Sequence, residues 1–390
     1  NYIKSIKNQE PIPMEKYFEK LIAHRRKLHT IPEIAFNEIE TGNYIKQCLH
    51  ELGYFNIQLM AKTGIIAEYR VNDGPYIAFR SDIDALKIKE ETGFEFASKN
   101  EGYMHACGHD LHISMLLTLA EWIEKTKPEK NILLIFQPAE EGLGGGEVMV
   151  KEGLFDKFNV KEVYALHNTT EYPVGTIALN EGKMFAGTIE FEIQLEGKGG
   201  HAAVPHLNND LITASVNLIN LLNAIEPRFL DPIHENLLSI GMIHAGEAAN
   251  ILPSSAVIKG TVRSYFKVDL NTIKTKIKDM VYSISIAFGI KAKLLIHSEY
   301  IPAVNNKEIV KKIKDTDFGK GINVVDCPQK MTGEDFGFML EAVPGAIAWL
   351  GAGNDLNRTT GLHNQAYNPD EKSMMVGFNF FKVILENFSI

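Results

Sequence analysis

The chain has 390 residues, of which 45% are hydrophobic and 23% are charged, fractions that are ordinary for a globular protein of two or three domains. Its 40 lysines and arginines against 49 acidic residues give a net charge of −9, which disfavours binding to nucleic acid or to an anionic membrane surface. No stretch reaches the ~18 apolar residues that a membrane span needs. The polar stretch from Asn1 to Pro13 lacks the apolar core of a signal peptide. Three cysteines, Cys48, Cys107 and Cys327, are too few for a disulfide framework, so we expect a cytoplasmic protein.

The first half of the chain alternates helical patterns with short apolar runs. Apolar residues recur at helical spacing over 14–28 and 45–52, where Gly53 is placed to end the second helix. A further helix is expected from about Asp110. Continuous apolar runs at 76–79, 131–136 and 163–166 lie between helical segments. Such runs are typical of buried strands in a sheet that helices cover on both faces.

The pattern changes near Thr188, where apolar and polar residues begin to alternate strictly through Leu195. This alternation predicts a strand with one wet face. A helix is expected over about 210–225, stopped by Pro227. Strands near 237–243 and 257–262, a helix over about 270–288 and a strand near 292–296 complete a β-α-β-β-α-β order, which predicts a ferredoxin-like insert.

After Ile301 the α/β pattern resumes, with a strand at 347–350 and a closing helix at about 370–386. We therefore predict an α/β protein of two domains. The catalytic domain has a mixed sheet with helices on both faces and comprises residues 1–184 and 298–390. A ferredoxin-like α+β lid domain is inserted over residues 185–297.

Metal-binding side chains gather at the ends of the predicted strands, where open α/β sheets bind ligands. Cys107 and His109 form a compact pair of donors, although a Cys-His pair also fits a structural site or a cysteine hydrolase. Glu141, His167 and His363 also lie in predicted loops. Five donors exceed the four of a closed structural zinc site. They fit two metal ions that share a ligand and leave positions open for water and substrate.

Two further acidic positions favour catalysis. The side chains of Glu140 and Glu141 point apart, so one can bind metal while the other removes a proton from water and later protonates a leaving amine. The alternative is an exposed acidic turn. Asp82 could likewise belong to an exposed acidic turn. If it is functional, we expect it to orient a histidine ligand. The glycine run from Gly142 to Gly146 lacks the ending of a nucleotide loop, so we expect flexible backbone that lets the glutamate pair approach the metals.

The inserted domain contributes three candidates. His201 lies in a glycine-rich turn and is either a solvent-exposed histidine or a group that crosses a cleft to polarise an amide oxygen. Arg263 can hold a substrate carboxylate through its planar fork, although a structural salt bridge is an equal alternative. Asn250 is a further candidate for substrate binding.

Five motifs in chain order carry a resemblance to a known family. They are His105-Ala-Cys107-Gly-His109-Asp-Leu-His112, Pro138-Ala-Glu140-Glu141-Gly142, Ala165-Leu-His167-Asn168, Gly199-Gly-His201-Ala-Ala and Gly333-Glu-Asp-Phe336. Together they resemble the amidohydrolase branch of the aminoacylase/carboxypeptidase metallopeptidase family, over about residues 25–369.

The resemblance implies a two-metal catalytic domain and a smaller lid domain that mediates a homodimer. By position, the metal ligands would be Cys107, His109, Glu141, His167 and His363. Glu140 would be the general base and Asp82 the buried acid beside the metals, and His201 would contact the scissile amide. The two divalent ions could be Zn, Mn, Ni or Co, and the resemblance leaves their identity open.

The resemblance also implies the reaction, which is metal-dependent removal of the acyl group from an N-acyl amino acid. Residues 171–178 and 331–337 are most similar to the deacetylases of lysine biosynthesis that act on N-acetyl-L,L-diaminopimelate, with Arg263 expected to bind the α-carboxylate. A hippurate-type or general N-acyl-amino-acid hydrolase is the alternative within the family. A non-catalytic binding module and a hydrolase that uses the Cys107 thiol are alternatives of other classes.

Overall fold

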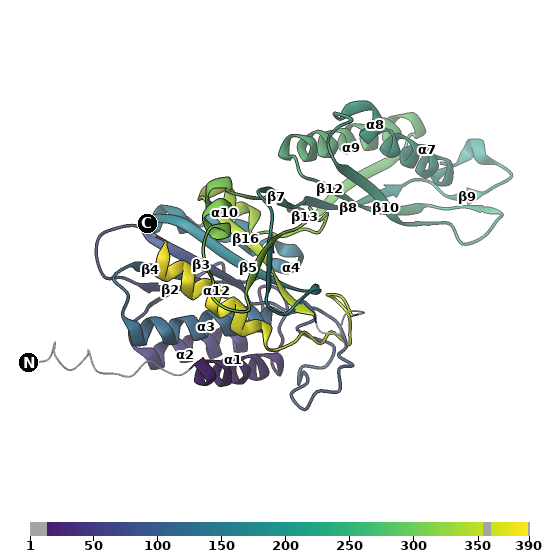
Figure 1. The fold of residues 1–390 in the computed structure, drawn as a ribbon. Coiled ribbons are helices and arrows are strands. Elements are labelled where there is room, and N and C mark those ends of the chain that lie inside the picture. Colours follow the sequence, from purple (N-terminus) through teal and green to yellow (C-terminus); the bar gives the residue numbers. More distant parts are fainter. Residues whose placement is uncertain (1–13, 354–359, 389–390) are drawn as a thin grey trace, which may run out of the picture.

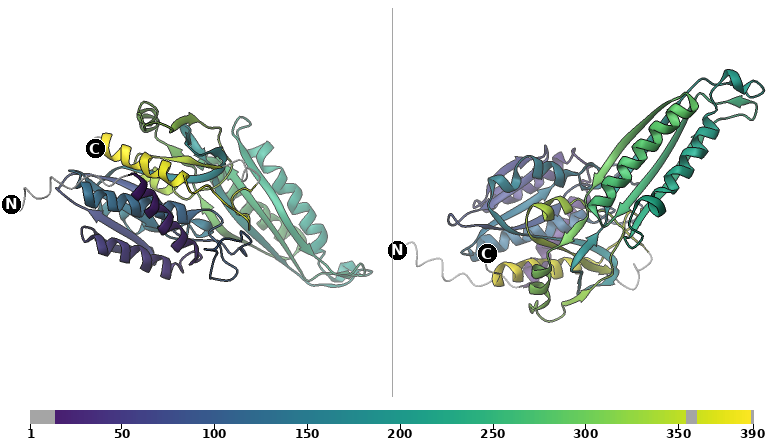
Figure 2. Two further views of the ribbon diagram at one scale, coloured as in Figure 1. Left: turned by 60° about the horizontal axis from the view of Figure 1, so that its bottom comes forward. Right: turned by 90° about the horizontal axis from the view of Figure 1, so that it is seen from above.

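The computed structural model describes residues 14–353 and 360–388, so the polar stretch from Asn1 to Pro13 lies outside the described residues (Figure 1). Two sheets dominate the fold, one of eight strands and one of four. The four-stranded sheet and its helices, which we call the lid, project away from the larger sheet (Figures 1 and 2). None of the helices in the described ranges has the length and apolar content needed to cross a membrane.

The large sheet is mixed, as predicted. Its strand order is β1-β2-β4-β3-β5-β16-β6-β15. The strands are β1 (Asn56–Met60), β2 (Gly64–Tyr69), β3 (Tyr76–Asp82), β4 (Asn131–Gln137), β5 (Val160–Pro173), β6 (Thr176–Leu179), β15 (Asn323–Asp326) and β16 (Gly345–Gly353). Strands β4, β3, β5 and β16 run parallel. Strand β2 pairs antiparallel with β1 and β4, and β6 pairs antiparallel with β16 but parallel with β15.

Helices cover both faces of this sheet. One core contains side chains of α1 (Met14–His29), α2 (Ile39–Leu52), α3 (His109–Thr126), α10 (Lys307–Lys314) and α12 (Ser373–Asn387). The opposite face packs against α5 (Gly145–Lys151), α6 (Leu154–Lys157) and α11 (Gly337–Ala342), after the short α4 (Glu140–Leu143). The small pair β7 (Gly182–Phe185) and β14 (Ala303–Asn305) lies at the passage to the lid. The prediction of a sheet buried on both faces is confirmed.

The lid has the predicted ferredoxin-like arrangement. Its antiparallel sheet has the order β10-β12-β8-β13, and α7 and α9 lie side by side on one face (Figure 2). The elements are β8 (Gly187–Glu196), α7 (Leu211–Asn223), α8 (Ile225–Phe229), β10 (Asn236–Ala245), β12 (Ser255–Ser264), α9 (Lys267–Phe288) and β13 (Lys291–Tyr300). A further pair, β9 (Gly200–His201) and β11 (Ile251–Leu252), lies at the far end of the lid. The domain boundaries at 185 and 297 stay a prediction.

One predicted helix boundary is wrong for a physical reason. Pro227 does not end the helix that begins after Asp210, because α7 already ends at Asn223. Pro227 instead lies in the first turn of the short helix α8. A proline is tolerated there because the first amides of a helix have no partner within the helix.

The parallel strands bring the predicted site together. Asp82 ends β3, Gln137 ends β4 immediately before Pro138, and His167 lies within β5. Since these strands are parallel neighbours, their carboxyl ends lie at one edge of the sheet. Helix α3 begins at His109, after the left-handed Gly108 (φ 81°), and so adds its first turn to the same edge.

A buried carboxyl group holds one loop at this edge. Glu38, which precedes α2, is fully buried. One of its oxygens accepts a hydrogen bond from the Thr63 hydroxyl at 2.5 Å and the other from the Ala139 amide at 2.9 Å. Burial raises the pKa of Glu38 to about 7, more than these hydrogen bonds lower it. Glu38 therefore remains a protonated acid at pH values where an exposed glutamate is ionised.

We expect Glu38→Gln to become more stable than the wild type as the pH rises from about 4.5 to 7. In this window the unfolded chain has lost the Glu38 proton while the folded chain keeps it, so the free energy of unfolding of the wild type falls by up to about 3 kcal/mol. Glutamine accepts the Ala139 bond without titrating. Urea unfolding at several pH values measures the difference, and Glu40→Gln on the exposed side of α2 is the control. A difference that stays constant with pH would contradict the argument.

Candidate metal centre and active site

A cavity of about 560 Å³ lies between the sheet edge and the near end of the lid. The sheet side supplies Cys107, Glu140, Glu141, His167 and His363, and the lid side supplies Thr188, Glu190, Arg263, Ser298 and Tyr300. Apolar side chains, Leu86, Phe185, Trp349 and Leu362, line part of the wall. All five predicted metal ligands and the predicted general base therefore face one cavity or lie directly behind it, His109 being the buried member.

Two of the predicted ligands are buried histidines that contact a backbone carbonyl through one ring nitrogen. His109 Nδ1 lies 2.9 Å from the Asp84 carbonyl oxygen, and its Nε2 is buried and without a hydrogen-bond partner. The carboxylates of Asp82 and Asp84 raise the pKa of His109 to about 10, against the effect of burial. His167 donates from Nδ1 to the Asn168 carbonyl at 2.9 Å, and its Nε2 lies 3.4 Å from Cys107 Sγ. Burial, with the nearby His112, lowers the pKa of His167 to about 3. Imidazoles whose second nitrogen is anchored to a backbone carbonyl in this way are typical metal ligands, and a bound cation would displace any proton from the ligating nitrogen.

The donors form two overlapping groups that share Cys107. One group is Cys107, His109 and His167, and the other is Cys107, Glu141 and His363, with the donor atoms of each group within 4.8 Å of one another. Glu141 Oε1 lies 3.2 Å from His363 Nε2. Burial and the charges of Glu141 and Glu140 raise the pKa of the Cys107 thiol well above its usual value. A nearby cation would favour the thiolate, so the residues present fit divalent metal ions.

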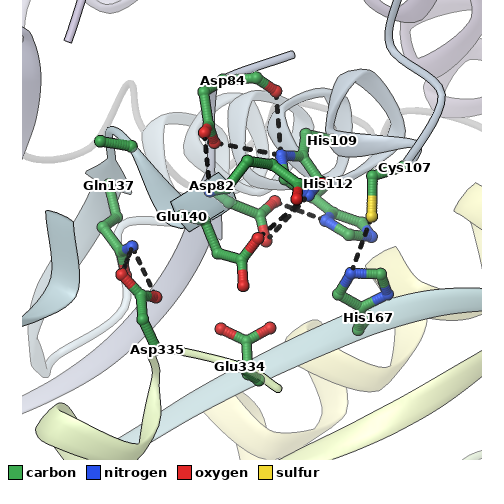
Figure 3. Close-up of polar contacts among 12 residues, drawn as sticks. Asp82, Asp84, Cys107, His109, His112, Gln137, Glu140, His167, Glu334 and Asp335 are labelled. Atoms are coloured by element: carbon green, nitrogen blue, oxygen red, sulfur yellow. Dashed lines mark hydrogen bonds and ion pairs between the residues drawn. The ribbon is translucent and has the colours of Figure 1, made fainter. Parts of the chain in front are cut away.

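Glu140 lies beside these donors without belonging to either shared group. Its side chain is buried, and Oε2 lies 4.0 Å from His109 Nε2 (Figure 3). The Tyr300 hydroxyl donates to the Glu140 carbonyl, and the Gly142 amide donates to the Tyr300 oxygen at 2.7 Å. The Glu141 amide donates to Asp84 Oδ2 at 2.9 Å. The loop that carries both glutamates is therefore fixed on each side.

Two glycines of the run after the glutamate pair are closely packed, whereas the predicted flexibility of the run stays a prediction. A Cβ at Gly145 would lie 1.7 Å from the Pro138 carbonyl oxygen, and one at Gly146 would lie 3.0 Å from the Asp335 carbonyl oxygen. Gly142 has a positive φ of 88°. These glycines allow close backbone approach and a left-handed turn.

Asp82 acts on the donors through a histidine that the sequence analysis did not assign. Its Oδ1 lies 2.6 Å from His112 Nδ1, whereas His109 Nε2 is 3.6 Å from Oδ2. The Asn168 amide donates to His112 Nε2 at 3.0 Å, and the Asn168 side chain donates to the Cys107 carbonyl at 2.7 Å. This chain of contacts ties the strand end of β3 to the Cys107 loop. The signal for His112 was present, because it shares the motif of Cys107 and His109.

A second group, centred on Arg80, lies behind the cavity. The guanidinium donates to Asp82 at 2.9 Å, Glu334 at 3.0 Å and Asp335 at 2.9 Å, and all four side chains are buried. Gln137 accepts a bond from Arg80 and donates to Asp335. An arginine that directly follows the apolar run at 76–79 was a usable sequence signal for this cluster. Nothing local in the sequence pointed to Tyr300.

Two predicted substrate contacts lie elsewhere. His201 is exposed in β9, where its Nδ1 accepts a hydrogen bond from the Ala203 amide at 3.0 Å. Asn250 is exposed next to β11, and its carbonyl accepts from the Ala202 amide at 3.0 Å. The β9–β11 pair lies at the end of the lid remote from the large sheet (Figure 1). The structure therefore brings His201 and Asn250 to each other but not to the cavity of their own chain, whereas Arg263 lines it.

Comparison with known proteins agrees with this geometry. Residues 78–387 match the family described as Peptidase family M20/M25/M40. The N-acetyldiaminopimelate deacetylase of Halalkalibacterium halodurans is 40% identical over 90% of this chain and 94% of the relative. That of Bacillus subtilis is 38% identical over 91% of this chain and 95% of the relative.

Solved structures share the fold over nearly the whole chain. A protein from methicillin-resistant Staphylococcus aureus superposes with a TM-score of 0.86 and 29% identity, covering 96% of this chain and 98% of its own. The YXEP protein of Bacillus subtilis, a dinuclear metal-binding peptidase, has a TM-score of 0.76 and 30% identity, covering 95% of this chain and 98% of its own. Divalent metal ions and a hydrolytic activity follow from this kinship. The resemblance found in the motifs is confirmed, and the chain belongs to peptidase family M20/M25/M40.

Proposed function

We propose that this hydrolase removes the acetyl group from N-acetyl-L,L-diaminopimelate and releases acetate and L,L-diaminopimelate. The observation that carries the proposal is the buried carboxylate of Glu140 beside two donor groups that share Cys107, in a cavity open to a small substrate. The relatives at 38–40% identity, which are N-acetyldiaminopimelate deacetylases, support the substrate. We infer that the enzyme acts in the cytoplasm, in keeping with three cysteines that are all free.

Two divalent ions fit the donors. Cys107, His109 and His167 would hold one ion, and Cys107, Glu141 and His363 the other. Thiolate and imidazole donors favour Zn, while the carboxylate also accepts Mn, Ni or Co. When bound, such ions polarise an amide carbonyl and lower the pKa of a water molecule.

Glu140 performs the proton transfers. Its carboxylate accepts a proton as water adds to the acetyl carbonyl carbon, and it returns that proton to the amide nitrogen as the C–N bond breaks. The anchored loop keeps the carboxylate at the donor groups, since the Tyr300 hydroxyl and Asp84 hold its backbone. Asp82, through His112 and Asn168, would keep the Cys107 loop in place. Arg263 would bind a carboxylate of the substrate.

A hippurate-type or general N-acyl-amino-acid hydrolase is the second candidate. The observation that favours it is the apolar wall of the cavity, where the Phe185 and Trp349 rings pack with centroids 4.8 Å apart. Such a wall can also accept the ring of a benzoyl group. The two candidates share the chemistry and differ in the acyl group.

We expect Glu140→Gln to lower kcat for N-acetyl-L,L-diaminopimelate by about 10²–10⁴-fold, because glutamine cannot accept the proton of the attacking water. The metal content should stay unchanged, since the donor groups that share Cys107 are intact. Acetate release measures turnover, and mass spectrometry measures the metal.

The control for this variant is Glu147→Gln, a partly exposed position on α5 that pairs with Lys151. Near-full activity of Glu140→Gln would exclude its role as the base. The same assay with benzoyl-glycine separates the two candidate substrates, and a higher kcat/KM for benzoyl-glycine in the wild type would exclude the deacetylase proposal.

We also propose a homodimer that forms through the lid. Strand β10 is an edge of the lid sheet, and α7 packs against it. Apolar side chains are exposed along this edge, namely Ile212, Val216 and Leu221 on α7 and Leu237 and Ile243 on β10. An unpaired strand beside an apolar helix face favours association with a second copy, because both the backbone groups and the apolar surface can then be covered.

Such a dimer gives His201 access to a substrate. His201 and Asn250 are neighbours on the remote end of the lid and do not line the cavity of their own chain. In a two-fold dimer the remote end of each lid extends beyond the shared edge towards the other copy. We propose that His201 acts there, donating a hydrogen bond to the amide oxygen in the site of the second copy.

Mixing the inactive variants Glu140→Gln and His201→Ala should restore about a quarter of wild-type activity once subunits exchange randomly. One of the two sites in each mixed dimer then has an intact Glu140 from one chain and an intact His201 from the other. If His201 acts within its own chain, no mixed site is complete and the mixture stays inactive. Light scattering measures the oligomeric state, and His206→Ala, also exposed on the lid, is the matched control.

Chelation should lower the melting temperature by several degrees, and Zn or Mn should restore it. Removal of the ions leaves buried carboxylates without compensating charge, and a ligand present at 100 times its Kd stabilises the folded state by about 2.7 kcal/mol. Scanning calorimetry measures the shift. His167→Ala is the control, because loss of a donor should abolish most of the response to metal. An unchanged wild-type melting temperature would argue against bound metal.

A further inference from the structure

The lid side of the cavity carries one anion and one cation next to each other. Glu190 on β8 and Arg263 on β12 both line the cavity, and Arg263 Nη2 lies 3.7 Å from Glu190 Oε1. In the strand register Arg263 is opposite Thr188, two residues from Glu190 on the same strand. The two charges therefore point from neighbouring strands into the space that faces the metal donors.

This pair is poorly explained as a structural salt bridge. The distance of 3.7 Å exceeds that of a good hydrogen bond, and the Glu190 side chain is 57% exposed. Pairs of this kind contribute little to stability. Among the described residues we find no other ion pair or hydrogen bond to either charged group. Both groups keep most of their hydrogen-bonding capacity for a ligand.

The next acidic residue along the same strand shows the contrast. Glu192 shares the wet face of β8 and is bound by Lys259 at 2.8 Å, by Gln194 at 2.7 Å and by His297 at 3.2 Å. It does not line the cavity. The carboxylate outside the cavity is satisfied by the protein, and the one inside it is not.

We propose that Glu190 and Arg263 form a subsite for the free amino acid end of the substrate, and that Glu190 selects its ammonium group. A free α-amino acid group carries an ammonium and a carboxylate on one carbon, which matches an adjacent carboxylate and guanidinium. The opposite wall, with Glu140 and the metal donors, receives the acylated end. This inference rests on the proposed function and assigns Arg263 to the far carboxylate instead of the one beside the amide.

Three substrates test the contributions of Glu190 and Arg263 separately, because they differ only in the ammonium and the carboxylate at the end away from the acetyl amide, which we call the far groups. N-acetyl-L,L-diaminopimelate has both far groups, N-acetyl-L-2-aminopimelate lacks the far ammonium, and Nα-acetyl-L-lysine lacks the far carboxylate. Each compound keeps the acetyl amide and the carboxylate beside it. The variants are Glu190→Gln and Arg263→Gln, and Glu196→Gln, exposed at the remote end of β8, is the matched control.

Glu190→Gln should lower kcat/KM by at least about 10-fold, mainly through KM, for the two substrates with a far ammonium, which is the effect of losing one charge-assisted hydrogen bond. For the aminopimelate compound the change should stay within about twofold. Arg263→Gln should instead lower kcat/KM for the two substrates with a far carboxylate and leave kcat/KM for Nα-acetyl-L-lysine nearly unchanged. The ratio of kcat/KM values between two substrates is measured on one enzyme preparation, so it does not depend on the fraction of enzyme that is folded.

An equal loss on all three substrates, or no loss, would overturn the subsite. A loss on all three for Arg263→Gln alone would place Arg263 at the carboxylate beside the amide. If the wild type cleaved none of the compounds, the proposed function would fail, and calorimetric binding of the same three compounds to the same variants would still decide the subsite by the same ratios.

Discussion

The site depends on a buried excess of negative charge. Six acidic side chains surround the metal donors, namely Asp82, Asp84, Glu140, Glu141, Glu334 and Asp335. In the described part of the chain, Arg80 is the one arginine or lysine paired with any of them. Burial and mutual repulsion raise the pKa values of Glu140 and Asp335 well above those of free carboxyl groups. Buried charges need partners, and divalent cations held by the donor groups would supply them for the carboxylates that Arg80 does not contact.

Unusual backbone conformations place the donors around this charge. Gly108 (φ 81°) precedes His109, Ala139 (φ 55°) precedes Glu140, and His363 itself has φ 63°. For a residue with a Cβ, the left-handed region costs roughly 1–2 kcal/mol. Local hydrogen bonds offset that cost, since the Ala139 amide donates to Glu38 and the His363 amide donates to the Ala106 carbonyl at 2.9 Å. These contacts fix the backbone of the Glu140 loop and of His363.

The sequence predicted the parts of the site that follow from strand ends, and it missed those that depend on distant contacts. Glu140 and His167 were predictable because they follow or lie in continuous apolar runs, whose carboxyl ends meet at one sheet edge. The alternation in β8 likewise predicted its buried face. Tyr300 could not be predicted, because its role is a contact with a loop 160 residues earlier. The place of His201 was equally hidden, since a motif specifies the residue type but not the end of the lid on which that residue lies.

The lid sheet connects the proposed far subsite to the loop that carries Glu140. Tyr300 on β13, Thr188 on β8 and Arg263 on β12 form one row across three strands. One end of this row holds the Glu140 loop through the Tyr300 hydroxyl, and the other end carries the guanidinium beside Glu190. A ligand that draws Arg263 towards the cavity therefore acts on the same strands that fix the Glu140 backbone. The proposed far subsite and the backbone of Glu140 are therefore joined through three adjacent strands of one sheet.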